Sequence, residues 1–205
     1  MTGNLIFDVG AHRGEETSRY LAAGARVVAV EPQLTLAREL ISRYSENYDL
    51  IVVAKACGAQ EGRINLYASS NTWLATCDPG KWSIGRFYNH RWLNKTEVEM
   101  ITLDRLIAYY GVPDFIKVDV EGYEMEVLRG LSVPVPALCY EFTAEFMDDA
   151  RECARMLIEL GDYEFAFCLG ENKEPGVYTD TETMFRQLAA IDAPLLWGDI
   201  YARLK

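Results

Sequence analysis

Short apolar runs alternate with amphipathic segments in the first quarter of the chain. The apolar runs are rich in β-branched residues, which predicts buried strands. Between two of them, apolar residues recur at spacings of three and four, which predicts a helix with one apolar face formed by Leu34, Ala37, Leu40, Ile41 and Tyr44. The predicted elements are strands at Leu5–Val9, Arg26–Val30 and Leu50–Ala54 and helices at Glu15–Ala23 and Leu34–Tyr44. This alternation indicates an α/β fold with a parallel sheet.

The same alternation resumes in the second half of the chain. Gly130 and Gly161 each follow an amphipathic segment and predict where its helix ends. The predicted elements here are strands at Phe115–Val120, Ala137–Phe142 and Tyr163–Cys168 and helices at Tyr123–Arg129 and Asp148–Leu160. The segment Glu182–Lys205 predicts a short helix followed by a strand around Leu195–Tyr201.

The segment between the two halves, Tyr67–Lys95, has no clear periodicity. It holds Trp73, Trp82, Trp92 and His90 among polar residues. Long insertions in compact domains tend to be lids or binding loops. We therefore expect residues 67–95 to be a loop or lid over an active site, although a surface excursion with its own aromatic cluster is an equal alternative.

Composition favours one domain with little affinity for polyanions. The 205 residues are 50% hydrophobic, enough for one core spanning residues 1–205. The net charge is −11 and no basic block occurs, which argues against unaided binding to nucleic acid or to an anionic membrane.

The cysteines and the first apolar run indicate a reducing compartment. The five cysteines are odd in number and widely spaced, as expected for reduced thiols in a core. The run Leu5–Val9 is interrupted by Asp8 and is too short for a signal peptide or a membrane span. We expect a soluble, cytoplasmic protein.

Acidic residues stand at or near the ends of three predicted strands. Because parallel sheets bind ligands beyond the carboxyl ends of their strands, Asp8, Glu31 and Asp119 should face one crevice. Glu31 lies 21 residues after Gly10, a spacing that suits an acid accepting hydrogen bonds from the hydroxyls of a ribose. A buried acid is costly without a partner, so a ligand is the favoured explanation.

The first loop argues against a pyrophosphate and for a cation. It reads Gly10-x-x-x-Gly14 and lacks the glycine spacing of dinucleotide-binding loops. Asp8, Glu15 and Glu16 would repel a diphosphate, although the two glutamates are also ordinary first-turn acids of a helix. S-adenosylmethionine carries a ribose, a sulfonium and an ammonium but no phosphate, and it fits this charge.

Four stretches together resemble a known family. They are "FDVGAHRGEET", "VVAVEPQ", "AKACGAQEGRINLY" and "ITLDRLIAYYGVPDFIKVDVEGYEMEVLRGL". They are similar to the successive signatures of FkbM-type S-adenosylmethionine-dependent methyltransferases and cover Leu5 to Leu131. The resemblance implies a class I, Rossmann-like, mostly parallel sheet of seven strands with a reversed final hairpin and helices on both faces. It also implies O-methylation of a hydroxyl on a sugar or another small molecule.

The resemblance further implies a cofactor site. The loop with Asp8, Gly10 and Gly14 would lie under the methionine moiety, and Glu31 with Pro32 would bind the ribose. Cys57 and Gly58 would contact the adenine. The full set of cofactor-binding candidates is Asp8, Gly10, His12, Gly14, Thr17, Glu31, Pro32, Cys57, Gly58 and Asp119. His12 replaces the asparagine of many relatives, so its role stays open.

A hydroxyl acceptor needs a base beside the transferred methyl group. The candidates are Asp119, Glu121, Glu141 and His90. Alternatively, the three acids would hold a divalent metal such as magnesium, which prefers oxygen ligands. The structural alternatives are that Glu121 caps the following helix and that Glu141 pairs with a Lys or Arg. Lys117, inside a strand, is expected to be a snorkelling or an ion-paired residue rather than a catalyst.

Two other functions compete with methyl transfer. One is an NAD-dependent oxidoreductase, which the spacing and charge of the first loop disfavour. The other is a non-catalytic, nucleoside-binding partner protein with a methyltransferase-like fold. The chain begins a few residues before its first strand, so a partner subunit or residues 67–95 would have to cover the site. A homo-oligomer therefore remains one of the alternatives.

Overall fold

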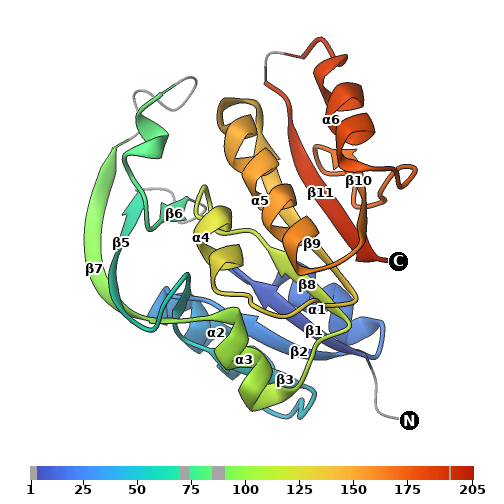
Figure 1. The fold of residues 1–205 in the computed structure, drawn as a ribbon. Helices are drawn as coiled ribbons and strands as arrows, with labels where there is room; N and C mark the ends of the chain where they lie inside the picture. The colour runs from blue at the N-terminus through green and yellow to red at the C-terminus, as the bar shows by residue number, and fades with distance from the viewer. Residues whose placement is uncertain (1–3, 70–73, 85–90, 194) are drawn as a thin grey trace.

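The central feature of the computed structural model is a twisted sheet of seven strands (Figure 1). The structure describes residues 4–69, 74–84, 91–193 and 195–205. The order of the strands is β10-β11-β9-β8-β1-β2-β3. These strands are β1 (Leu5–Val9), β2 (Arg26–Val30), β3 (Leu50–Val53), β8 (Phe115–Val118), β9 (Ala137–Thr143), β10 (Tyr163–Leu169) and β11 (Trp197–Leu204).

Six of the seven strands run in the same direction, and β11, between β9 and β10, runs in the opposite one. β1 pairs in parallel with β2 and β8, and β9 continues the parallel order beside β8. β11 is antiparallel to both β9 and β10. The expected seven-stranded, Rossmann-like sheet with a reversed final hairpin is confirmed.

The period of two along each strand sends apolar residues to both faces of the sheet. Phe7 and Val9 of β1 pack in the larger core, whereas Ile6 packs with the smaller core on the opposite face. The smaller core is covered by α1 (Glu15–Ala22) and α2 (Leu34–Arg43). The larger core is covered by α3 (Leu103–Tyr110), α4 (Glu124–Arg129), α5 (Met147–Leu160) and α6 (Thr181–Ala189), with the 3-10 turn η3 (Ala144–Phe146) preceding α5.

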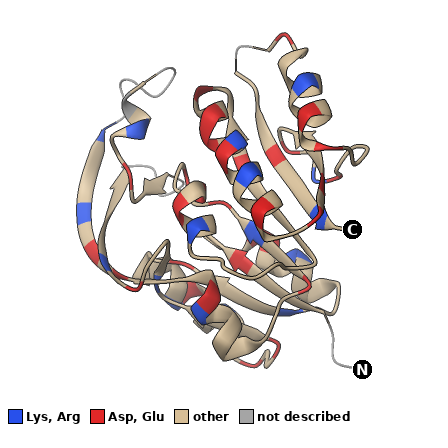
Figure 2. Cartoon of the chain, in the orientation of Figure 1, with Lys and Arg blue, Asp and Glu red and all other residues tan. Residues whose placement is uncertain are grey.

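The amphipathic pattern of α5 accounts for its position. Cys153 and Leu157 are fully buried against the sheet, one turn apart. On the opposite side, Arg155 forms ion pairs with Glu152 and Glu159. Figure 2 shows acidic and basic residues alternating along this exposed side of the helix. Such pairs at spacings of three and four lend modest stability to a helix whose position is set by its apolar face.

A second sheet stands beside the first and was not predicted. Its order is β4-β7-β5-β6, formed by β4 (Ala56–Cys57), β5 (Gly62–Ser69), β6 (Ala75–Thr76) and β7 (Trp92–Ile101). In Figure 1, β5 and β7 form a long curved ribbon to one side of α4. Its inner face packs through Leu66, Val98 and Met100 against Tyr123, which immediately precedes α4.

The expectation that residues 67–95 lack regular structure is corrected in part. β5 extends to Ser69, β6 and the 3-10 turn η1 (Lys81–Ser83) lie within the segment, and β7 begins at Trp92. Most of β7 is exposed on both faces, so its sequence lacks the alternation that marks a half-buried strand. His90 and Trp73 lie outside the described residues.

The cysteines and the helices can be compared with what the sequence predicts about disulfides and membrane spans. All five cysteines are free, four of them buried and Cys77 half-buried, which confirms the interpretation as reduced core thiols. Burial raises the pKa of Cys57 to about 12, so this thiol is protonated at neutral pH. Among the described residues, every helix is too short or too polar to traverse a lipid bilayer.

Candidate active site

The loop that follows β1 crosses the end of β8 at very close range. Gly10 has a φ of 88° and Gly14 a φ of 82°. A Cβ on Gly10 would lie 1.7 Å from the carbonyl oxygen of Asp119, and one on Gly14 would lie 2.5 Å from Cδ2 of Leu40. Only glycine combines a left-handed backbone with such an approach. The two glycines therefore draw the first loop tightly over the carboxyl edge of the sheet.

Asp8 forms the buried floor of this edge. Its side chain accepts a hydrogen bond from Thr17 Oγ1 at 2.5 Å, and the two residues are 2% and 0% exposed. Burial raises the pKa of Asp8 to about 6, while the hydrogen bond from Thr17 opposes the shift. Thr17 thus fixes the orientation of Asp8 from behind.

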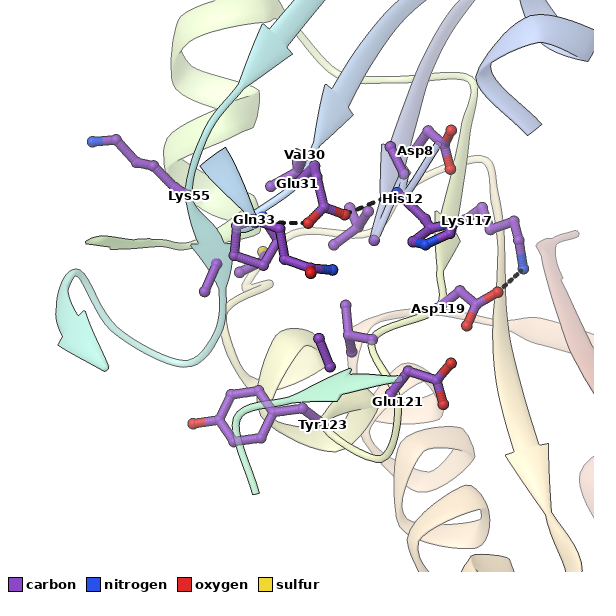
Figure 3. A pocket seen from close by; sticks show the side chains of 18 of the residues that line it. Asp8, His12, Val30, Glu31, Gln33, Lys55, Lys117, Asp119, Glu121 and Tyr123 are labelled. Atoms are coloured by element: carbon purple, nitrogen blue, oxygen red, sulfur yellow. Dashed lines mark hydrogen bonds and ion pairs between the residues drawn. The ribbon is translucent and has the colours of Figure 1, made fainter. Parts of the chain in front are cut away.

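Glu31, just after β2, is held by two backbone amides. The amide of His12 donates to Oε2 at 2.9 Å and the amide of Gln33 donates to Oε1 at 2.7 Å (Figure 3). Burial raises the pKa of Glu31 to about 7, although the two hydrogen bonds favour the carboxylate and lower the pKa in part. Each carboxylate oxygen still has a lone pair. Glu31 is therefore a rigid double acceptor, and two adjacent hydroxyls of a ribose could donate to it.

A cavity of about 220 Å³ joins these residues to the end of β8. Figure 3 shows Glu31 between Lys55 and Tyr123 on one side and Asp8, Asp119 and Glu121 on the other. The predicted residues that line the cavity are Asp8, Gly10, His12, Glu31, Pro32, Cys57, Asp119 and Glu121. Gly14, Thr17 and Gly58, also predicted, are not among the lining residues and support the wall from outside it.

Sequence reasoning missed part of this lining. Leu66, Ala75 and Cys77 come from the second sheet, whose strands lack a clear period. Tyr123 could have been found, because it lies within the "EGYE" stretch next to the candidate base. These residues give the Cys57 end of the cavity an apolar wall suited to a planar base.

An ion-pair network supports Asp119 from inside the sheet. Lys117 Nζ lies 3.1 Å from Oδ2 of Asp119 and 3.4 Å from Oδ1 of Asp199 on β11. Lys173 adds a second cation 3.2 Å from Asp199. Burial opposes the charge on Lys117, but Asp119 and Asp199 outweigh it and raise the lysine pKa. Lys117 is ion-paired, as expected.

The turn between β8 and α4 is strained and heavily braced. Glu121 has a φ of 57°, which is uncommon for a residue with a side chain. Oε1 of Glu124 accepts hydrogen bonds from the amides of Val120 and Gly122 at 3.0 and 3.2 Å. No side chain among the described residues caps α4, so the capping role considered for Glu121 is wrong, and Glu124 instead braces the turn that precedes the helix.

Glu121 and Glu141 have no hydrogen-bond or ion-pair partner among the described residues. Glu121 lines the main cavity, and Glu141, on β9, lines a smaller one behind it. Burial, and then the charge of Asp119, raise the pKa of both carboxyl groups well above the usual range. The alternative that Glu141 pairs with a Lys or Arg is wrong. Two unpaired carboxyl groups with raised pKa values are typical of proton-transfer sites.

The metal alternative finds no ready-made site in the described part of the chain. No group of three or more His, Cys, Asp or Glu side chains there is arranged to hold a metal ion. Asp119 is instead engaged with Lys117. His90, the fourth candidate base, lies outside the described residues.

Solved structures resemble the chain at low identity. A precorrin-6y C5,15-methyltransferase from Geobacter metallireducens is 9% identical, with a TM-score of 0.47 and coverage of 99% of this chain and 82% of that one. An rRNA methylase from Streptococcus thermophilus is 11% identical, with a TM-score of 0.46 and coverage of 100% and 89%. No curated protein matches the chain.

The sequence itself matches a family model over most of its length. The model describes the methyltransferase FkbM domain and matches residues 8–166. The matched segment begins at Asp8 and includes Glu31, Asp119, Glu121 and Glu141. The chain therefore belongs to the FkbM methyltransferase domain family, whose reaction is methyl transfer from S-adenosylmethionine.

Proposed function

We propose that this protein transfers a methyl group from S-adenosylmethionine to a hydroxyl of a sugar or another small molecule. The observation that carries the choice of a hydroxyl is the unpaired carboxyl group of Glu121 at one end of the main cavity. A hydroxyl must lose its proton on methylation, and a carboxylate with a raised pKa is a stronger base than an ordinary one.

The cavity suits the cofactor in shape and charge. Glu31 offers two fixed acceptors to the ribose, and the apolar wall around Cys57 and Leu66 suits the adenine. Gly10, which also lines the cavity, lets the first loop pass directly over the Asp119 carbonyl. Asp8 and Asp119 give the opposite end the negative charge that a sulfonium and an ammonium group favour. When bound, S-adenosylmethionine supplies the electrophilic methyl group.

The residues of the chain would then perform the proton transfer. Glu121 would accept the proton that the acceptor hydroxyl loses when its oxygen takes the methyl group and S-adenosylhomocysteine leaves. Asp119, paired with Lys117, would hold the cationic end of the cofactor. Glu141, on the adjacent strand, is the second candidate base.

The described part of residues 67–95 supports a role as a cover. Trp82, in η1, is 2% exposed and contacts the turn that carries Glu121. Lys81 donates to the carbonyl of Gly122 at 3.0 Å and forms an ion pair with Asp149 of α5. We infer that this segment closes the acceptor side and excludes water from the base.

Two measurements test the function. Calorimetric titration with S-adenosylhomocysteine and with NAD should show binding of the first alone. Incubation with S-adenosylmethionine and a panel of hydroxyl compounds, read by mass spectrometry, should yield a product heavier by one methylene that Glu121→Gln forms far more slowly. A protein that binds the cofactor but methylates only nitrogen or carbon would contradict O-methylation.

A further inference from the structure

A second cavity lies directly behind the catalytic turn. Its volume is about 20 Å³, which is enough for one group the size of a water molecule. It lies between η1, the β8–α4 turn, the end of β9 and the start of α5. Glu121 lines the main cavity and the next residue, Gly122, lines this one. The same turn therefore contributes to the lining of both cavities.

The polar side chains that line this cavity carry more hydrogen-bond acceptors than the donors around them can satisfy. Thr143 is only 7% exposed, and its Oγ1 has no hydrogen-bond partner among the described residues. The carboxyl group of Glu141 has no partner either. Two more acids, Glu124 and Asp149, line the same space, the second paired with Lys81. Buried acceptors left unsatisfied are costly, so a donor is expected to fill the space.

Aromatic rings form the rest of the wall. The cavity is lined by Trp82, Phe142 and Phe146. The rings of Trp82 and Phe146 pack edge to face, with their centroids 5.9 Å apart. The indole N–H of Trp82 donates to the carbonyl of Glu121. Aromatic faces attract cations, and desolvation strengthens the attraction. Carboxylates and aromatic rings around a space of this size are the surroundings that an alkylammonium group prefers.

We propose that the second cavity binds a protonated primary amine of the methyl acceptor, which places a neighbouring hydroxyl of the same molecule at Glu121. The inference rests on the proposed function and names its substrate class, an amino alcohol or amino sugar. An ammonium group has three donors and no acceptor, which matches Thr143 and the acids. A bound ammonium group would lower the raised pKa of Glu141 and favour its carboxylate form, whereas a neutral hydroxyl of the same size would not.

Methylammonium chloride is the smallest probe of this site, and methanol is its neutral counterpart. Dissociation constants can be measured by ligand-observed NMR, with and without saturating S-adenosylhomocysteine. We expect methylammonium to bind at least about tenfold more tightly than methanol, a difference of about 1.4 kcal/mol. 2-Aminoethanol should displace it, and ethylene glycol should not.

Two variants remove the proposed contacts and a third serves as control. Glu141→Gln removes the charge, and Thr143→Val keeps the shape while removing the unpaired hydroxyl. Each should weaken methylammonium binding, by about tenfold and several-fold respectively, with thermal unfolding confirming that the fold is kept. Asp148→Asn alters an exposed acid next to Asp149 and should leave binding unchanged.

Three results would overturn the inference: equal binding of methylammonium and methanol, no binding of methylammonium, or unchanged binding in Glu141→Gln. These outcomes are separate from a failure of the proposed function, which would appear as absent S-adenosylhomocysteine binding. If methylammonium binds as expected to a protein that cannot bind the cofactor, the amine site stands and the assignment to a methyl acceptor falls.

Discussion

Trp82 donates its indole N–H to the backbone carbonyl of Glu121 over 2.8 Å, so a residue of the second sheet's connection fixes the turn that carries the proposed base. A Cβ on Gly122 would lie 2.8 Å from the same indole nitrogen. The indole thus occupies space that any side chain at position 122 would need. The position of Glu121 depends on this packing as well as on the sheet.

Replacing Trp82 with Phe should therefore affect catalysis more than cofactor binding. The change removes one buried hydrogen bond, worth about 1 kcal/mol of stability, and frees the strained turn. We expect kcat to fall while the affinity for S-adenosylhomocysteine, measured by calorimetry, stays the same. Tyr48→Phe, at a residue 96% exposed, is the control. A normal kcat in Trp82→Phe would show that the turn holds its shape without the indole.

Glu31→Ala should weaken S-adenosylhomocysteine binding by about 1.5–3 kcal/mol, the range for hydrogen bonds to a charged group. Calorimetry gives the value directly. Glu39→Ala removes an exposed acid of α2 and should leave affinity unchanged. Because Glu31 also binds the amides of His12 and Gln33, Glu31→Gln is a second variant that keeps one acceptor. If both variants bind normally, Glu31 does not hold the ribose.

Glu121→Gln and Glu141→Gln separate the two candidate bases. The one that accepts the proton should lower kcat by roughly two to four orders of magnitude when replaced, with little change in cofactor affinity. We expect the larger loss for Glu121, which lines the main cavity. Glu182→Gln, in the first turn of α6, is the control. Full activity in both carboxamide variants would leave alignment of the acceptor as the source of catalysis.

The unliganded protein should lose stability as the pH rises from about 4.5 to 7, because of its buried acids. Folding raises the pKa of Glu31 from 4.5 to about 7, so the unfolded chain releases this proton first and the folded state is penalised in that range. For Glu31 alone the loss is roughly 3 kcal/mol. Urea unfolding of wild type and Glu31→Gln at several pH values measures it. A pH-independent difference between the two proteins would contradict the prediction.

Gly10→Ala should be far more damaging than Gly24→Ala, although both glycines have a positive φ, 88° and 82°. A Cβ at position 24 meets nothing within 4 Å, so only backbone strain of about 1–2 kcal/mol is added. At position 10 the Cβ would overlap the carbonyl of Asp119 and displace the first loop. We expect a larger loss of unfolding free energy and loss of S-adenosylhomocysteine binding. Similar stability of the two variants would show that the loop adapts.

Local patterns were enough to predict the main sheet and several of the residues that line the main cavity. The parallel strands are buried on both faces and read as apolar runs, and their terminal acids Asp8, Glu31 and Asp119 converge as expected. The reversed hairpin followed from the family resemblance alone. The second sheet could not be predicted, because strands such as β7 are exposed and their pairing joins distant residues. The bracing by Glu124 and Trp82 depends on tertiary contacts that no spacing reveals.

The position of β11 determines how late in synthesis the sheet around Lys117 can be completed. β11 follows β10 in the chain but lies between β9 and β10 in the sheet, so β9 has an unpaired edge until β11 has been synthesised. Asp199, the buried counterion of Lys117, arrives on that same strand. A ribosome-bound chain that lacks β11 therefore carries an open strand edge and a lysine paired with Asp119 alone. The growing polypeptide cannot complete the ion pairs around Lys117 before this late strand has emerged and inserted.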